Sequence, residues 1–164
     1  MLSSACKYAI RAMLYLALHS RKDRKIGVKE IGETLGIPKP FLAQLFRTLT
    51  TNELVSSIKG PGGGYFLTGE NRQRTVWDIV LCIDGPSKFD ACFLGLDKCD
   101  DQNPCPVHYA VGPFKKKILA DFRFKSIDML AGEIAEKGTL ISLKGLDLMP
   151  RASGTGESGH QSLP

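Results

Sequence analysis

Three cysteines and one histidine lie close together in this 164-residue sequence, and all four carry side chains that bind soft metals. Six residues separate Cys92 from Cys99, five separate Cys99 from Cys105, and two separate Cys105 from His108. Three thiolates and one imidazole suit either an iron-sulfur cluster or a structural zinc ion. We therefore predict a cofactor site in this segment, with these four residues as its ligands.

The spacing favours a cluster, but zinc stays open as an alternative. Structural zinc sites commonly use ligands about two to four residues apart, and no Cys-x-x-Cys pair occurs between residues 92 and 108. A redox-sensitive thiol switch is a third interpretation. His108 is the least secure ligand, because a histidine where a loop meets a helix often caps the helix or faces solvent. Asp97, Asp100 and Asp101 are the alternative fourth ligands.

The rest of the composition predicts a cytoplasmic protein that meets a polyanion. The sequence has five cysteines but neither an export signal nor a long apolar run, so we expect no disulfide framework and no membrane span. Residues 1–75 hold 12 Lys and Arg against 5 Asp and Glu, a charge of +7. Residues 76–164 hold 10 against 12, a charge of −2. The basic half is therefore expected to face nucleic acid.

The first 75 residues have the apolar periodicity of a helix-turn-helix. A first helix follows the cap residues Ser3 and Ser4, a second ends at Gly36, and a third begins near Pro40, where the missing N–H of proline costs nothing. Cys6 lies in the apolar stripe of the first helix and is expected to pack there, as is Cys82 in a later helix. Two short helices joined by a tight turn can place the second of them in the major groove of DNA.

The third helix carries polar side chains opposite its buried stripe. Glutamine can pair with adenine and arginine with guanine, so we expect Gln44 and Arg47 at base edges. Thr48 and Thr51 suit the DNA backbone, and Lys39 near the helix start suits a phosphate. A helix-turn-helix can also be only a packing motif with a solvated face, but the charge distribution favours DNA binding.

A glycine-rich run after the third helix indicates a two-stranded wing. Residues 54–58 and 65–67 are strand-like, and residues 59–64 between them are Lys-Gly-Pro-Gly-Gly-Gly. We expect Lys59, Gly62 and Gly63 at a phosphate or in the minor groove. A phosphate-binding loop is the alternative, but the run lacks both the Gly-Lys-Ser/Thr ending and the helix that would follow it.

The predicted fold class is mainly α with a small β wing, in five parts. These are a winged helix-turn-helix DNA-binding domain (1–75), a linking helix (76–85), a cysteine-rich cluster-binding loop (86–108), a pair of amphipathic helices (109–137) and a disordered tail (138–164). Pro113 is expected to mark where regular helix begins after the loop.

These runs together resemble the family of winged-helix transcription regulators that includes IscR, NsrR and CymR. The resemblance lies in residues 7–12 (Lys-Tyr-Ala-Ile-Arg-Ala), 41–46 (Phe-Leu-Ala-Gln-Leu-Phe), 54–57 (Leu-Val-Ser-Ser), 59–65 and the three-cysteine loop. It implies a cytoplasmic homodimer without enzymatic activity, in which 109–137 are dimerisation helices. Two recognition helices then face successive major grooves, so the double-stranded operator is expected to be a pseudo-palindrome.

The resemblance also implies a cluster that senses iron-sulfur status, redox state or nitric oxide. IscR-like members hold a 2Fe-2S cluster with three cysteines and a histidine three residues after the last one, a position that His108 matches. NsrR-like members hold a 4Fe-4S cluster with a carboxylate from the first helix. Lys7 lies near that carboxylate position here, so the 2Fe-2S arrangement is favoured and 4Fe-4S is the alternative.

Two departures limit what the resemblance carries over. Ala43 stands where IscR-like recognition helices use a glutamate to discriminate operators, so the target sequence cannot be inferred. Lys59 stands where the family more often has a wing arginine, which keeps the charge but loses the planar fork of donors. A zinc-stabilised or thiol-switch DNA-binding regulator and an iron-sulfur electron-transfer protein are the competing functions.

Overall fold

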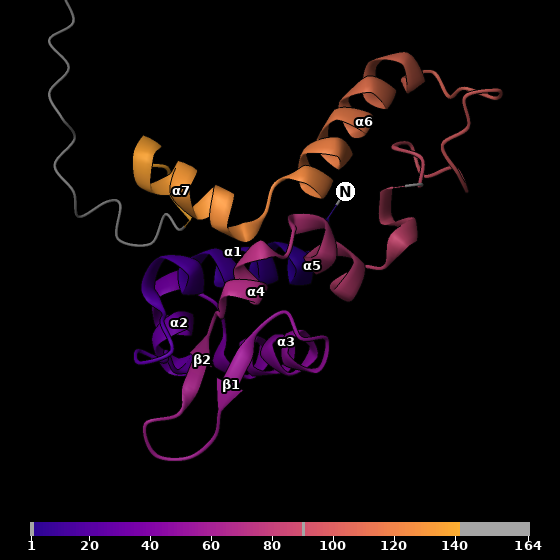
Figure 1. Ribbon diagram of the computed structural model, residues 1–164. Helices are drawn as coiled ribbons and strands as arrows, with labels where there is room; N and C mark the ends of the chain where they lie inside the picture. Colours follow the sequence, from indigo (N-terminus) through magenta and orange to yellow (C-terminus); the bar gives the residue numbers. More distant parts are fainter. Residues whose placement is uncertain (1, 90, 142–164) are drawn as a thin grey trace, which may run out of the picture.

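The computed structural model describes residues 2–89 and 91–141. Its elements are α1 (Ser4–His19), α2 (Val28–Leu35), α3 (Lys39–Thr51), β1 (Ser56–Ile58), β2 (Gly64–Phe66), α4 (Gly69–Gln73), α5 (Val76–Ile83), the 3-10 helix η1 (Pro86–Phe89), α6 (His108–Phe124) and α7 (Ile127–Lys137). Helices α1–α5 and the two strands form one body, over which α7 lies and from which α6 rises (Figure 1). The predicted class, mainly α with a small β wing, is confirmed.

Helix α1 forms the centre of the core, where it packs against α2, α3, α5 and α7. Its N-terminus is capped by Ser3, whose Oγ accepts from the Cys6 N–H at 3.0 Å. Met13 and Leu16 are fully buried, and each contributes roughly 1.5–3 kcal/mol through its burial. The sequence therefore folds around its first helix, which holds the helix-turn-helix and α7 together.

The turn between α2 and α3 depends on two glycines. Gly36 ends α2 in the left-handed conformation at φ 67°. A Cβ on Gly32 would lie 2.8 Å from the Ile37 carbonyl oxygen, so the chain can cross back over α2 only because this residue has no side chain. Pro40 lies in the first turn of α3, as predicted. The buried stripe of α3 is Leu42, Leu45, Phe46 and Leu49.

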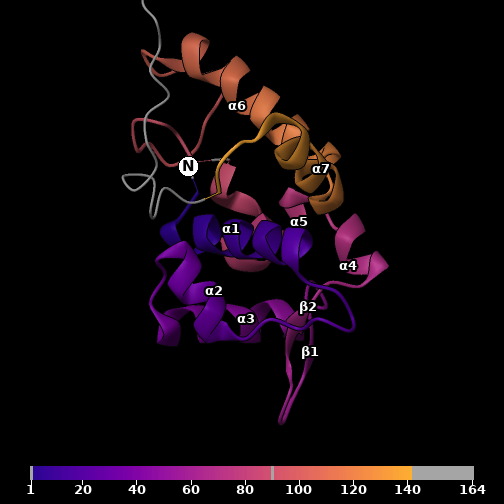
Figure 2. The same cartoon turned by 90° about the vertical axis from the view of Figure 1, so that its left-hand side faces the viewer.

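The wing is an antiparallel pair in which Ser56 is opposite Phe66 and Ile58 is opposite Gly64. A third segment joins it through an isolated bridge between Ile26 and Tyr65, with backbone hydrogen bonds of 2.9 Å in both directions. Seen from the side, the wing and α6 project from opposite ends of the body (Figure 2). The part predicted to touch DNA is thus far from the helix that follows the cysteine loop.

Helix α4, between the wing and α5, was not anticipated from the sequence. Thr68 and Asn71 form a capping box around its first turn, and Thr75 and Asp78 do the same for α5. The Asn71 side chain is buried, accepting from the Thr68 N–H at 3.0 Å and donating to the Glu53 carbonyl at 2.9 Å. Asn71 therefore ties the entry and exit of the wing to the body.

Helix α6 begins earlier than predicted. The expectation that Pro113 marks its start is wrong, because α6 already begins at His108 and Pro113 lies inside it. The His108 N–H donates to the Cys105 carbonyl at 2.9 Å and the Val111 N–H to the Val107 carbonyl at 3.0 Å, which forms the first turn before the proline. His108 is thus a helical residue and not the last residue of the loop.

The predicted disordered tail, residues 138–164, falls mostly outside the described residues, because 142–164 are not described. Gly138 ends α7 in the left-handed conformation at φ 61°. The Ile141 carbonyl accepts from Arg11 Nε at 2.6 Å, and the same guanidinium donates to the Leu35 carbonyl at 2.9 Å. Residues 138–141 are thus held against α1 and the end of α2.

Candidate DNA-binding face and cysteine loop

The polar residues predicted on α3 lie on its outer face. Lys39, Gln44, Arg47 and Thr51 are exposed. Thr48 is half-buried, and its hydroxyl donates to the Gln44 carbonyl of the preceding turn at 3.3 Å. The amide of Gln44 and the guanidinium of Arg47 are therefore available to a groove of DNA, whereas the Thr48 hydroxyl is already engaged within its helix.

The wing residues predicted to contact DNA lie in the connection between β1 and β2. Lys59 and Gly62 are exposed, and Gly63 is half-buried. Gly62 has a φ of +71°, which favours glycine. A Cβ on Gly63 would lie 2.2 Å from the Ile58 carbonyl oxygen, so glycine is sterically required there. The glycines shape the tip of the wing and leave Lys59 as its cation.

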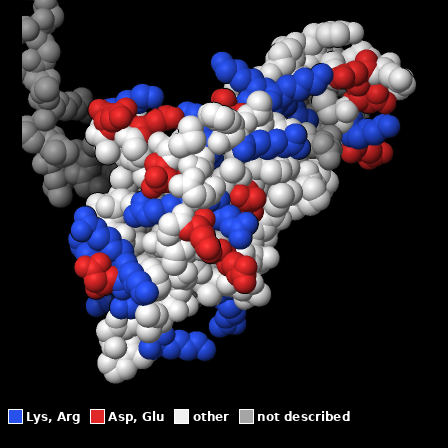
Figure 3. All heavy atoms as spheres, viewed as in Figure 1, with Lys and Arg blue, Asp and Glu red and all other residues white. Residues whose placement is uncertain are grey.

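Charge is distributed unevenly over the surface. In Figure 3, Lys and Arg side chains gather beside α2, near the tip of the wing and over the region where α6 lies in Figure 1, whereas a group of Asp and Glu side chains lies where the segment before α6 runs. The loop between α1 and α2 supplies the exposed cations Arg21, Lys22 and Arg24. Cations are thus exposed on the helix-turn-helix and wing, where residues 1–75 carry a charge of +7, and a second group of cations lies on α6.

The four predicted ligands lie between η1 and the first turn of α6. Cys92, Cys105 and His108 are buried, with exposed fractions of 7–8%, and Cys99 is half-buried. The structure contains no disulfide bond between any of the five cysteines. The hydrogen bond from the His108 N–H to the Cys105 carbonyl fixes the two residues next to each other.

Cys92 lies in a tight turn that favours its thiolate. The Gly95 N–H donates to the Cys92 carbonyl at 3.0 Å, which closes the turn. The backbone N–H of Leu94, and to a smaller extent that of Leu96, bonds to the sulfur and lowers the pKa of the Cys92 thiol below its ordinary value despite burial. A hydrogen bond from the Cys105 side chain and the charge of Lys115 lower this pKa further. Cys92 and Cys105 thus form one pair of sulfur donors.

Cys99 and His108 form a second pair. Cys99 Sγ lies 3.6 Å from His108 Nδ1, and the other ring nitrogen, Nε2, lies 3.0 Å from Asp101 Oδ1. Asp101 Oδ2 in turn contacts Lys116 Nζ at 3.3 Å. The pKa of the Asp101 carboxyl is held below its ordinary value, first by the hydrogen bond from Lys116 and next by its charge and by the contact with His108.

The four donor side chains therefore lie in two pairs, Cys92 with Cys105 and Cys99 with His108, and do not surround a single point. Within residues 2–89 and 91–141, no group of three or more His, Cys, Asp and Glu side chains is arranged to hold a single metal ion. One tetrahedral zinc ion needs four donors around one centre, whereas a cluster of two irons takes two donors on each. Sulfur donors and N–H groups directed at sulfur suit the chemistry of an iron-sulfur cluster.

The alternative fourth ligands have other partners. Asp100 accepts from the Gln102 N–H at 2.9 Å and from Asn103 Nδ2 at 3.2 Å, so it closes the loop on itself. Asp97 is exposed. Asp101 reaches the histidine and not a thiol. Sequence reasoning named Asp101 only as a competing ligand and missed its contact with His108, because residues seven apart in an irregular loop have no fixed relation.

A groove of about 640 Å³ runs beside the cysteine loop along α6. Its lining is mostly apolar and includes Leu2, Phe93, Phe114, Ile118 and Phe122, with Lys7 and Cys92 also at its wall. The residue that α1 brings to the cysteine loop is therefore a cation. Over the 17 residues of α6 only His108 and Gly112 are buried, and Phe114 is 58% exposed. This helix leaves most of its apolar surface open.

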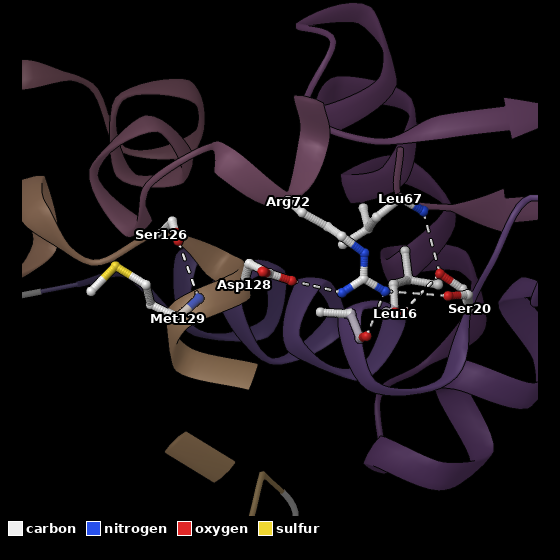
Figure 4. A network of polar contacts seen from close by, with 8 residues as sticks. Leu16, Ser20, Leu67, Arg72, Ser126, Asp128 and Met129 are labelled. Carbon is white, nitrogen blue, oxygen red and sulfur yellow. Dashed lines mark hydrogen bonds and ion pairs between the residues drawn. The ribbon is translucent and has the colours of Figure 1, made fainter. Parts of the chain in front are cut away.

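A polar network that the sequence did not reveal joins α1, α4 and α7 (Figure 4). Arg72 of α4 pairs with Asp128 of α7 at 3.0 Å and donates to the Ala17 carbonyl at the end of α1 at 2.8 Å. The Ser20 hydroxyl donates to the Leu16 carbonyl at 2.7 Å and accepts from the Leu67 N–H. Helix α7, which follows α6, is thereby joined to α1 and α4.

The two other cysteines pack in the helical body. Cys6 is fully buried in the core. Cys82 is half-buried on α5 with its Sγ 4.0 Å from the Thr48 carbonyl oxygen of α3, and burial raises the pKa of its thiol. The prediction that both pack as small hydrophobic side chains agrees with these surroundings.

Comparison with known proteins gives one consistent result. The profile of the Rrf2 family, described as "Iron-dependent Transcriptional regulator", matches residues 2–133. A relative from Aquifex aeolicus, described as an HTH-type transcriptional regulator, is 37% identical over 127 residues, which is 76% of this chain and 87% of the relative. The regulator IscR of Sodalis glossinidius is 38% identical over 107 residues, 65% of this chain. That match spans 64% of the Sodalis protein, just under two thirds.

Solved structures agree on the fold. The cysteine regulator CymR of B. subtilis superimposes with a TM-score of 0.64 at 24% identity, covering 81% of this chain and 97% of CymR. IscR of T. potens superimposes with a TM-score of 0.59 at 27% identity, covering 85% and 91%. The relatives from Aquifex and Sodalis are named as HTH-type transcriptional regulators and CymR as a global cysteine regulator, and none of them is named as an enzyme. In the described part of the chain, every helix is too short or too polar to cross a bilayer.

Proposed function

The chain belongs to the Rrf2 family of transcriptional regulators, and on this basis we propose that it is a homodimeric repressor or activator whose DNA binding responds to a 2Fe-2S cluster. The ligands of that cluster are Cys92, Cys99, Cys105 and His108. The observation that carries this proposal is the contact of Cys99 with His108 at the start of α6, together with the burial of Cys92 and Cys105 in the same loop.

The DNA-binding part of the proposal rests on α3 and the wing. Gln44 and Arg47 are exposed on the helix that follows the tight turn, where they can reach base edges in the major groove. Lys39, Thr48, Thr51, Lys59, Gly62 and Gly63 supply the contacts to phosphates, sugars and the minor groove. Ala43, half-buried between these residues, leaves the operator sequence to be determined by experiment.

The dimer rests on the surface of α6. Apart from its contact with α5, this 17-residue helix has only two buried residues and an apolar groove along it, so the described residues leave much of its surface uncovered. A second copy crossing the first along this groove would bury Phe114 and Ile118 in a two-fold interface. Two copies of α3 would then face two major grooves, and the operator is proposed to be a pseudo-palindrome.

The cluster can influence DNA binding through α5. This helix lies directly before the cysteine loop and packs against α1, α3 and α6. Cys82 of α5 contacts the backbone of α3 at Thr48, one turn from Gln44. When bound, the cluster would supply a link between the segments around Cys92, Cys99 and α6, and it would be lost on oxidation or nitrosylation. A coupling of about 1–3 kcal/mol would change operator affinity by roughly 5- to 150-fold.

Metal analysis of anaerobically purified protein tests the cofactor. We expect visible absorption with about two irons and two sulfides per chain. Each of the variants Cys92→Ala, Cys99→Ala and Cys105→Ala should lose the colour, whereas Cys82→Ala should keep it. Stoichiometric zinc in a colourless protein would favour a zinc-stabilised regulator, and the proposed cluster would be rejected.

A salt titration of operator binding tests the DNA-binding face. Arg47→Ala should weaken specific binding by about 1–3 kcal/mol, because a guanine contact is lost. Lys59→Ala should weaken binding to all DNA sequences similarly. It should also reduce the slope of log affinity against log salt concentration by about 1, the amount that one phosphate contact contributes. Lys137→Ala, which removes an exposed cation from α7, is the matched control and should change neither quantity. Unchanged affinity in both Arg47→Ala and Lys59→Ala would contradict the assigned face.

A further inference from the structure

His108 presents its two ring nitrogens to different partners, and this decides how it can hold a metal. We propose that His108 binds iron through Nδ1, on the same iron as Cys99, and that Asp101 is the positioning residue that holds Nε2–H on the opposite side of the ring. This inference rests on the proposed cluster and goes beyond it by assigning the ligand atom, the ligand pair on one iron and a residue that orients the ring.

The distance between the two ligand atoms matches one edge of a metal site. Two donors bound to the same tetrahedral metal at about 2.3 Å for sulfur and about 2.1 Å for nitrogen lie about 3.6 Å apart. Cys99 Sγ and His108 Nδ1 are 3.6 Å apart without any metal. An iron can therefore replace the thiol proton between them with little movement of either residue. The Fe–S and Fe–N bonds form, the S–H bond breaks, and its proton leaves to solvent.

The tautomer of the ring follows from its second contact. Nε2 lies 3.0 Å from a carboxylate oxygen of Asp101, which can only accept while it is ionised, so Nε2 carries the hydrogen and donates it. In a neutral imidazole Nδ1 then has the free lone pair, and that lone pair faces Cys99. A carboxylate on the far nitrogen is the usual means by which proteins orient a metal-binding histidine.

The elements around His108 leave the ring little freedom to turn over. His108 is 7% exposed and lies in the first turn of α6, one helical turn before the buried Gly112. Lys116, two turns after His108 on the same helix, holds the second carboxylate oxygen of Asp101 at 3.3 Å. Lys116 and Asp101 are both largely exposed, and their contact places one carboxylate oxygen beside α6 while the other oxygen contacts the histidine. Asp97, in the same loop, is exposed and has no such contact with His108.

Nitrogen hyperfine spectroscopy of the reduced cluster tests the assignment. The full chain is prepared anaerobically in two batches, with histidine carrying 15N at Nδ1 or at Nε2, and is reduced by one electron with dithionite. We expect strong 15N coupling in the Nδ1 batch and several-fold weaker coupling in the Nε2 batch. His19→Gln should leave both spectra unchanged, and His108→Cys should retain a cluster that lacks the strong nitrogen coupling.

Variants of the carboxylate test the positioning role. Asp101→Ala should mix or lose the strong Nδ1 coupling, Asp101→Asn should restore it because the amide oxygen still accepts from Nε2–H, and Asp97→Ala should leave it unchanged. Strong coupling from Nε2 in the unmodified protein would overturn the ligand assignment. An Asp101→Ala spectrum identical to that of the unmodified protein would overturn the positioning role. Both results leave the proposed cluster intact, whereas a colourless protein would overturn the cluster and this inference together.

Discussion

Asn71 shows how much one buried polar side chain can decide at the scale of the residue. It accepts from the Thr68 N–H and the Ser56 hydroxyl, and it donates to the carbonyl of Glu53, a non-glycine residue with φ 56°. Removing one member of such a buried set leaves the others without partners. Asn71 therefore holds both ends of the wing in the position that α3 requires.

We predict that Asn71→Ala lowers the free energy of unfolding by about 1–3 kcal/mol, because buried donors and acceptors lose their partner. Urea denaturation measures the change. Asn52→Ala is the control, since its amide donates to the Thr48 carbonyl at an exposed position and its loss should cost much less. Equal effects of the two substitutions would show that Asn71 is not the anchor of the wing.

Glu133 is a second residue whose setting leads to a measurable result. Lys125, at the end of α6, contacts its carboxylate at 2.7 Å, and Lys137 of α7 contacts it at 3.4 Å. The hydrogen bond from Lys125, followed by its charge and the weaker effect of Lys137, lowers the pKa of Glu133 below its ordinary value of 4.5. Folding lowers the pKa of Glu133, so the ionised carboxylate stabilises the folded protein at pH values above the pKa that Glu133 has in the unfolded chain. This stabilisation is lost as the pH falls through the lower pKa of the folded state.

We predict that Lys125→Met raises the pKa of Glu133 more than Lys137→Met does. An NMR titration of the Glu133 carboxyl carbon between pH 2 and 6 measures both changes. Glu133→Gln should narrow the difference in stability between neutral and acid pH, with the loss of stability confined to neutral pH. A larger effect of Lys137→Met would show that Lys137, and not Lys125, is the main partner of the Glu133 carboxylate.

At the scale of the element, the helices with a strong apolar stripe could be predicted from sequence. The caps of α1 and α2, the proline at the start of α3 and the glycine-rich connection of the wing all follow from local chemistry, and the structure confirms them. Helix α4 was missed because five residues without an apolar stripe have no periodicity to detect. The start of α6 was misplaced because Pro113 was given more weight than the backbone bonds before it.

The sequence was enough to predict which residues form the candidate site, but not which of them lie next to each other. Thiol and imidazole side chains mark cysteine and histidine as candidate metal ligands by their chemistry alone. Their association into Cys92 with Cys105 and Cys99 with His108 depends on the path of an irregular loop, which no periodic pattern describes. The contacts of Asp101 and Lys116 could not be predicted for the same reason, since Asp101 lies in this irregular loop and Lys116 lies on the helix that follows it.

The exposed apolar face of helix α6 leads to a prediction about dimerisation. Phe114→Glu should convert a dimer into a monomer, because it places a charge in the apolar groove that a second copy would cover. Ala120→Glu is the matched control, since Ala120 lies on the opposite side of α6 and is exposed. Sedimentation velocity at several protein concentrations gives the result. A Phe114→Glu protein that sediments like the unmodified dimer would assign the groove to some other partner.

At the scale of the whole molecule, two regions with different chemistry lie at opposite ends. The basic helix-turn-helix and wing are at one end, and the cysteine loop with α6 is at the other (Figures 1 and 2). Helix α5 contacts α3 and α6, and the Arg72 network fastens α7 to α1. The cysteine loop is therefore connected to α3 by packed elements, which is the physical basis of the regulation proposed above.

Affinity of one operator for the same protein with and without its cluster tests this account most directly. Genomic fragments captured by the anaerobic protein supply the operator, and fluorescence anisotropy at fixed salt measures binding before and after removal of the cluster. We predict a change of roughly 5- to 150-fold between the two states, corresponding to a coupling of about 1–3 kcal/mol, with the protein dimeric in both. Equal affinity of the two forms, or capture of no specific fragment by either, would contradict it.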